Sequence, residues 1–295
     1  MTPVAMASVE PRLRRVQCLD ARGLHRMAYW EWGDPASKRV LVCVHGMARQ
    51  GRDFDTLACA MQGEFRVVCP DIVGRGESDR LADPLAYQMQ TYVADMVTLL
   101  ARIDVESFAW VGTSLGGLIG MVVASLPGSP VGRLVLNDVG PAIDAAWITR
   151  IASYLGAPLT WASEDEAAEY LLTISPGFGP HSGAQWMALT RPMLRREGER
   201  FRLHYDPAIA LAMRAVTPEI AAAGQALAWA AYDAIPCPTL LLRGADSDAL
   251  RSATAKAMTE RGPKARLHEF AGVGHAPTLV APEQVDIVRE FLLSP

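Results

Sequence analysis

Cysteine is scarce in this sequence, and the common metal-binding and disulfide patterns are missing. The five cysteines are scattered over 295 residues without a C-x-x-C pair. An odd number of scattered cysteines is typical of reduced thiols in a cytosolic protein. We therefore expect free thiols, no bound metal and a cytoplasmic location.

Long apolar runs and blocks of basic residues are missing as well. No stretch reaches the roughly eighteen apolar residues of a membrane-spanning helix, and the first eight residues lack the basic start and apolar core of a signal peptide. The net charge of −4 is small, and no Lys/Arg block stands out. We expect neither nucleic acid nor a membrane as a partner, but a small-molecule substrate and a monomer or homodimer.

What the sequence does contain is an alternation of apolar strands and helices. Continuous apolar runs predict buried strands at residues 40–44, 66–70, 107–111, 133–137, 238–243 and 266–270. Helical stretches lie at residues 86–103, 115–126, 252–261 and 282–293. This alternation predicts a mostly parallel sheet flanked by helices, and residues 14–33 predict an antiparallel hairpin at its edge.

One long segment, residues 141–231, lacks this alternation of strands and helices. It contains no clear buried strand, and glycines and prolines interrupt its amphipathic helical pieces. We interpret it as a helical insertion on top of the sheet, so that residues 1–140 and 232–295 form the core. Long helix-and-loop connections are the alternative.

The most informative motif is Gly112-Thr113-Ser114-Leu115-Gly116. An apolar strand precedes this G-x-S-x-G pentapeptide and an apolar helical stretch follows it. Strand, sharp turn and helix is the context in which G-x-S-x-G presents a nucleophilic serine. Glycines beside the serine let the backbone make this tight turn without side-chain clashes. The motif predicts Ser114 as a catalytic nucleophile.

Three further motifs follow predicted strands in a fixed order. They are Val44-His45-Gly46-Met47, Asp71-Ile72-Val73-Gly74-Arg75-Gly76-Glu77-Ser78, and Gly272-Val273-Gly274-His275-Ala276-Pro277. With the serine motif, they make the chain resemble the α/β-hydrolase fold family over nearly its whole length. The resemblance implies a mostly parallel eight-stranded sheet with a helical cap inserted after the sixth strand. A serine nucleophile argues against the dehalogenase and epoxide hydrolase branches, which use a carboxylate.

The general base that the serine needs is predicted to be His275. A neutral imidazole can accept the serine proton and return it to the leaving group. Of six histidines, this one lies on a glycine-rich loop beyond a strand end, where the family places its histidine. His45 belongs to the His-Gly turn, where we expect it to brace the loop by hydrogen bonding.

The acid that orients the imidazole is open between three aspartates. Asp248 and Asp246 both follow the strand that ends near Leu242, which gives the chain order Ser…Asp…His of this fold. The resemblance favours Asp248, because related chains often have a Ser-Asp pair followed by an apolar residue here. Asp138, after the preceding strand, is where a minority of the family places its acid.

Other residues are expected to bind the substrate. The backbone N–H groups of Leu115 and Met47 are predicted to form the oxyanion hole. Arg49 and Arg52 follow the His-Gly turn and either bind a substrate carboxylate or pair with nearby aspartates. Trp147 is one of several aromatic residues in the insertion that we expect around a mainly apolar pocket.

These residues predict a serine hydrolase of carboxylic esters or lactones that needs no cofactor. The alternative is a hydrolase of carbon–carbon bonds in diketo acids from aromatic degradation, which uses the same triad and requires an arginine for the substrate carboxylate. A ligand-binding member without catalytic activity is a third reading. The presence of candidates for every triad position argues against it.

Overall fold

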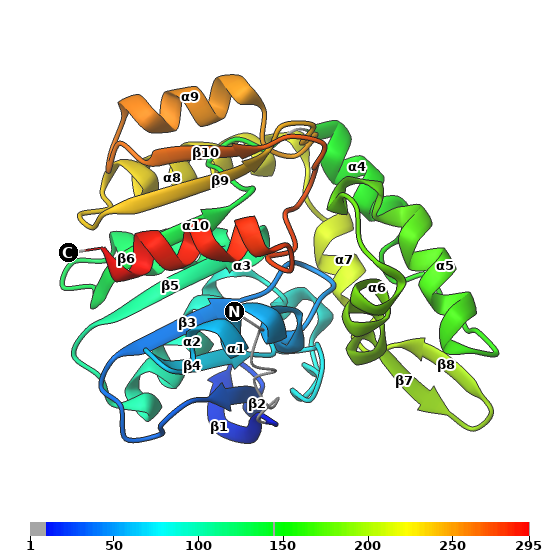
Figure 1. Ribbon diagram of the computed structural model, residues 1–295. Coiled ribbons are helices and arrows are strands. Elements are labelled where there is room, and N and C mark those ends of the chain that lie inside the picture. Colours follow the sequence, from blue (N-terminus) through cyan, green and yellow to red (C-terminus); the bar gives the residue numbers. More distant parts are fainter. Residues whose placement is uncertain (1–9, 144, 295) are drawn as a thin grey trace.

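The computed structural model describes residues 10–143 and 145–294, and an eight-stranded sheet forms its centre (Figure 1). The strands lie in the order β1-β2-β4-β3-β5-β6-β9-β10. Their bounds are Arg12–Asp20 (β1), Gly23–Trp32 (β2), Val40–Val44 (β3), Arg66–Pro70 (β4), Phe108–Thr113 (β5), Val131–Asn137 (β6), Thr239–Gly244 (β9) and Arg266–Phe270 (β10). β1, β2 and β4 pair antiparallel and the remaining neighbours pair parallel, which confirms the predicted sheet and its edge hairpin.

Helices cover both faces of the sheet. α1 (Asp55–Met61) and α10 (Pro282–Leu293) pack on one face through an apolar cluster. α2 (Met89–Ile103), α3 (Leu115–Ser125), α8 (Pro218–Asp233) and α9 (Ser252–Glu260) contribute to the cluster on the other face. Every residue of β3 is buried, as its unbroken apolar sequence requires for a strand covered on both sides.

The segment between β6 and α8 forms a separate layer beside the sheet (Figure 1). It contains α4 (Ala145–Tyr154), α5 (Glu164–Ile174), α6 (Gly183–Thr190), β7 (Leu194–Glu197), β8 (Arg200–Leu203) and α7 (Ile209–Arg214). The small antiparallel hairpin of β7 and β8 corrects the expectation of helices alone. Because α8 packs against α3 in the layer that flanks the sheet, we propose that the cap comprises α4 to α7 and that α8 belongs with the core.

The cysteines and the helix hydropathy bear on two expectations from the composition. All five cysteines are free, as their scattered positions predicted. Among the helices of the described residues, none has both the length and the hydropathy that crossing a membrane requires.

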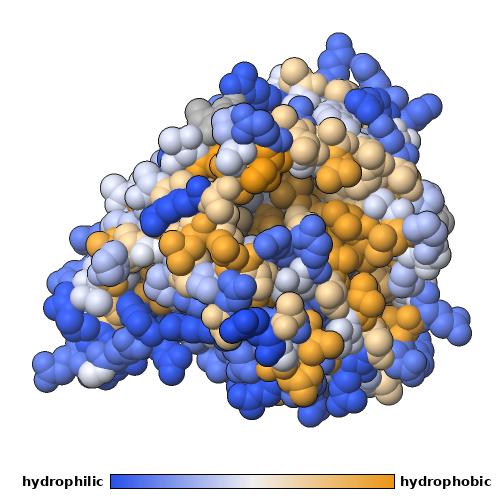
Figure 2. Space-filling view, turned by 180° about the vertical axis from the view of Figure 1, so that it is seen from behind, coloured by the Kyte–Doolittle hydropathy of each residue, from blue (hydrophilic) through white to orange (hydrophobic). Residues whose placement is uncertain are grey.

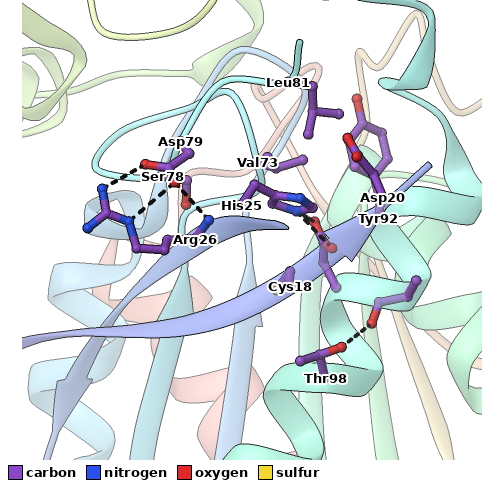
Figure 3. Close-up of polar contacts among 12 residues, drawn as sticks. Cys18, Asp20, His25, Arg26, Val73, Ser78, Asp79, Leu81, Tyr92 and Thr98 are labelled. Carbon is purple, nitrogen blue, oxygen red and sulfur yellow. Dashed lines mark hydrogen bonds and ion pairs between the residues drawn. The ribbon is translucent and has the colours of Figure 1, made fainter. Parts of the chain in front are cut away.

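A buried polar cluster connects α2 to the edge hairpin (Figure 3). Cys18 and His25 are direct partners across β1 and β2, and His25 Nε2 lies 3.1 Å from both carboxylate oxygens of Asp95 on α2. The hydrogen bond to Asp95 raises the pKa of His25, and burial raises the pKa of Asp95. Burial also raises the pKa of Cys18 to about 12, so this thiol is protonated. The His25–Asp95 pair therefore joins a helix to the sheet inside the core.

Removing this pair is expected to destabilise the fold in a pH-dependent way. Asp95→Ala leaves His25 buried without its partner, which should lower the free energy of unfolding by about 3 kcal/mol. Because the pKa of His25 is raised on folding, the pair's stabilisation is complete below the unfolded pKa and declines as the pH rises through the folded one. Urea unfolding should therefore show a larger loss at pH 6 than at pH 9.

The control is Glu290→Ala, which removes an exposed ion pair with Arg266 and should cost less than about 1 kcal/mol. An equal loss for Asp95→Ala at both pH values would contradict the assigned ion pair.

Candidate active site

Ser114 occupies a strained turn between β5 and α3. Its φ of 52° and ψ of −116° are unusual for a residue with a side chain. The flanking glycines are required by close contacts: a Cβ at Gly112 would lie 2.3 Å from the Gly116 carbonyl oxygen, and one at Gly116 would lie 2.0 Å from the Val44 carbonyl oxygen. The turn has the conformation that the G-x-S-x-G motif predicted.

Ser114, His275 and Asp138 form one chain of hydrogen bonds. His275 Nε2 lies 3.1 Å from Ser114 Oγ, and His275 Nδ1 lies 2.7 Å from Asp138 Oδ2. Asp138 is fully buried and also accepts hydrogen bonds from the Gly244 N–H at 2.9 Å and the Ser247 hydroxyl at 2.6 Å. A carboxylate placed in this way holds the imidazole with Nε2 free to accept the serine proton.

The prediction that Asp248 contacts the histidine is wrong. Asp246 and Asp248 are both exposed, and Asp248 pairs with Arg150 of α4 at 2.5 Å. The residue between them, Ser247, is the one that turns inward, and its hydroxyl donates to Asp138. The end of β9 and the loop after it thus each supply a hydrogen-bond donor to Asp138, which directly follows β6.

The His-Gly turn lies directly beside the serine. A Cβ at Gly46 would lie 3.6 Å from Ser114 Cβ. His45 is fully buried; its Nδ1 donates to the Gly46 carbonyl at 2.7 Å, and its Nε2 accepts the Ile72 N–H at 2.9 Å. Burial lowers the pKa of His45 to about 3, so the imidazole is neutral. This bracing role is the one that we expected for His45.

A buried arginine that the sequence analysis did not single out holds the same turn. Arg75 Nε donates to the Met47 carbonyl at 2.9 Å, and its Nη1 donates to the Val73 carbonyl at 2.7 Å. Asp71 accepts the Glu77 N–H group within its own loop and the Gly51 N–H group from the segment after the His-Gly turn. Arg75 could have been recognised as a member of this loop motif, but its contact with Met47 depends on the fold.

A mainly apolar cavity of about 140 Å³ opens next to Ser114 and His275. Its apolar walls come largely from the cap and include Trp147, Ile151, Leu159, Leu171, Ile174, Phe178, Leu189, Met193 and Leu203. The molecular surface has a hollow with a largely apolar rim on the face shown in Figure 2. The apolar lining of this cavity suits an acyl chain or another weakly polar substrate.

Of the three predicted substrate-binding residues, Trp147 and Arg49 line the cavity. The Trp147 ring packs edge-on against His275 with centroids 5.0 Å apart. Arg49 forms a bidentate pair with Asp53 at 2.6 and 2.7 Å and donates to the Leu189 carbonyl of the cap. Arg52 lies outside the cavity, where it pairs with Asp55 and covers the Trp30 ring.

Comparisons with known proteins agree with this architecture. The family model described as the alpha/beta hydrolase family matches residues 41–286. The chain belongs to the α/β hydrolase family. A 3-hydroxybutyrate-oligomer hydrolase of Cupriavidus necator is 51% identical over 288 residues, which are 96% of this chain and 98% of that protein.

Solved structures give the same result. An α/β hydrolase from Novosphingobium aromaticivorans superposes with a TM-score of 0.85 at 33% identity, over 97% of this chain and 99% of that one. A putative hydrolase from Rickettsia typhi has a TM-score of 0.86 at 28% identity, over 96% and 99% of the two chains. This α/β hydrolase is therefore an enzyme of the hydrolase class.

Two substitutions should separate the candidate acids of this α/β hydrolase. Asp138→Asn removes the acceptor for His275 Nδ1, and we expect kcat/KM for p-nitrophenyl butyrate to fall about 10³- to 10⁴-fold. Asp248→Asn changes only an exposed ion pair, so kcat/KM for this uncharged ester should stay within about twofold. Circular dichroism checks that both variants are folded. A large loss for Asp248→Asn together with little loss for Asp138→Asn would show that Asp248, and not Asp138, orients His275 during catalysis.

Proposed function

We propose that this enzyme hydrolyses the ester bonds of 3-hydroxybutyrate oligomers through a Ser114–His275–Asp138 triad. The observation that carries this proposal is the 51% identity to the oligomer hydrolase of Cupriavidus necator. The similarity spans 96% of this chain, so it includes the cap residues that line the cavity as well as the core. The apolar cavity beside Ser114 supports a substrate with methyl-bearing acyl units.

The proposed reaction uses each contact of the site. His275 Nε2 takes the proton of Ser114 as its Oγ attacks the ester carbonyl carbon. The N–H groups of Leu115 and Met47 stabilise the oxyanion, and Arg75 fixes the position of Met47 through its carbonyl. The ester C–O bond then breaks, and His275 returns the proton to the leaving alcohol. Water, deprotonated by His275, hydrolyses the acyl-serine, while Asp138 stabilises the imidazolium in both steps.

Arg49 and Arg52, the arginines first considered for carbon–carbon bond hydrolysis, are not available for a substrate. That chemistry needs an arginine free to bind a substrate carboxylate next to the scissile bond. Arg49 and Arg52 are each paired with an aspartate, and Arg191 is paired with Glu164. Among the residues that the structure describes, Arg150 in the cavity wall is held only by the exposed Asp248, so the choice of ester hydrolysis rests on the similarity to the oligomer hydrolase.

Substrate comparison tests this proposal. The enzyme should release acid from linear 3-hydroxybutyrate trimer, measured by pH-stat titration, and should hydrolyse p-nitrophenyl butyrate far better than the decanoate. Ser114→Ala should lose at least about 10³-fold of either activity. Hydrolysis of aryl esters with no turnover of the trimer would refute the proposed substrate and leave the serine mechanism standing.

A further inference from the structure

A second arginine in the cavity wall, Arg150, has a guanidinium that forms only a weak, exposed ion pair in the described part of the chain. Its Nη2 contacts one oxygen of Asp248 at 2.5 Å, and the two side chains are 38% and 54% exposed. Within the described part of the chain this is the one hydrogen bond that its guanidinium makes to another side chain. An exposed ion pair of this kind contributes little free energy, so the guanidinium has donors available for another anion.

Arg49, the other guanidinium among the described residues of the cavity wall, is different. Asp53 neutralises it with two hydrogen bonds and the Leu189 carbonyl takes a further one. Both partners of that pair are largely buried, at 14% and 17% exposure. Arg49 therefore joins the cap to the core, and Arg150 is the cation that a ligand can reach.

The position of Arg150 on α4 relates it to the reacting atoms. Trp147, Arg150, Ile151 and Tyr154 all line the cavity, so one face of α4 runs along it at helical spacing. Trp147 lies against His275, and Arg150 follows after three residues, a rise of about 4.5 Å along the helix axis. Arg150 and Trp147 therefore line the same cavity as Ser114 and His275, on one face of α4.

The ends of a hydroxyacid oligomer differ in charge. A linear oligomer has a hydroxyl at one end and one carboxylate at the other. In its last unit, three covalent bonds separate the ester oxygen from the carboxylate carbon, about 3.8 Å when extended. A carboxylate this close to the scissile ester lies in the same cavity as Ser114, and the wall of that cavity includes Arg150.

We propose that Arg150 binds the terminal carboxylate of the oligomer, so that the enzyme removes single hydroxyacid units from the carboxyl end. This inference rests on the proposed function. The bond that breaks joins the acyl carbon to the hydroxyl oxygen of the terminal unit. That oxygen receives the serine proton through His275, the rest of the chain is held as an ester on Ser114 Oγ, and one water releases it. A charge-assisted, bidentate contact with the carboxylate selects this ester.

The test compares linear 3-hydroxybutyrate trimer with its methyl ester, which has the same ester bonds but no carboxylate. The wild-type enzyme should prefer the free acid. In Arg150→Gln, kcat/KM for the free acid should fall about 10- to 100-fold, mainly through KM, while kcat/KM for the methyl ester stays within about twofold. Arg52→Gln, which disrupts a similar Arg–Asp pair outside the cavity, should change neither value.

A second measurement identifies the bond that is cleaved first. Rapid acid quenching of the wild-type enzyme with the trimer, followed by mass spectrometry, should show two hydroxybutyryl units on Ser114, because the terminal unit has left. One unit on Ser114, or an Arg150→Gln enzyme that keeps its preference for the free acid, would overturn the role of Arg150. If the wild-type enzyme hydrolyses neither trimer, the proposed function itself fails.

Discussion

The buried carboxylate of Asp138 is the interaction on which the site depends. A fully buried charge is costly unless several donors surround it. Here the donors come from separate segments: the Gly244 N–H at the end of β9, the Ser247 hydroxyl of the following loop, and His275 Nδ1 beyond β10. The ends of three neighbouring strands must therefore be in place before the histidine can be oriented toward Ser114. The orientation of His275 and the packing at this edge of the sheet therefore both depend on the hydrogen bonds to Asp138.

The cap is tied to the core by polar contacts around the cavity. The Gly76 N–H donates to the His204 carbonyl at 2.9 Å, and the Asp206 N–H donates to the Gly74 carbonyl at 2.7 Å. Tyr87 adds a hydroxyl bond to Asp206 at 2.7 Å. The first two contacts begin in the same glycine-containing loop that holds Asp71 and Arg75. One loop thus supports both the oxyanion turn and the position of the cavity's cap.

The strands of the sheet and the turn at Ser114 could be predicted because short stretches of sequence determine them. Apolar runs define strands, and the glycines around Ser114 define a turn that few other residues permit. The acid could not be chosen in this way, since Asp138 and Asp248 both follow strands at the same sheet edge. The choice depends on which side chain faces inward, and in the structure that is Ser247 rather than either neighbouring aspartate. The sequence likewise did not single out Arg150, because its position in the cavity wall depends on how the cap packs against the core. The hairpin of β7 and β8 was not predicted because its strands have four residues each and contain no buried residue.

The central claim is that Ser114 carries the acyl group during turnover, activated by His275. The most direct measurement is mass spectrometry of the enzyme after reaction with a fluorophosphonate probe, with the modified peptide sequenced. The account predicts one adduct per chain, located on Ser114, and very slow labelling when His275 is replaced by alanine. Labelling at another residue, or labelling of Ser114 at an unchanged rate without His275, would contradict it.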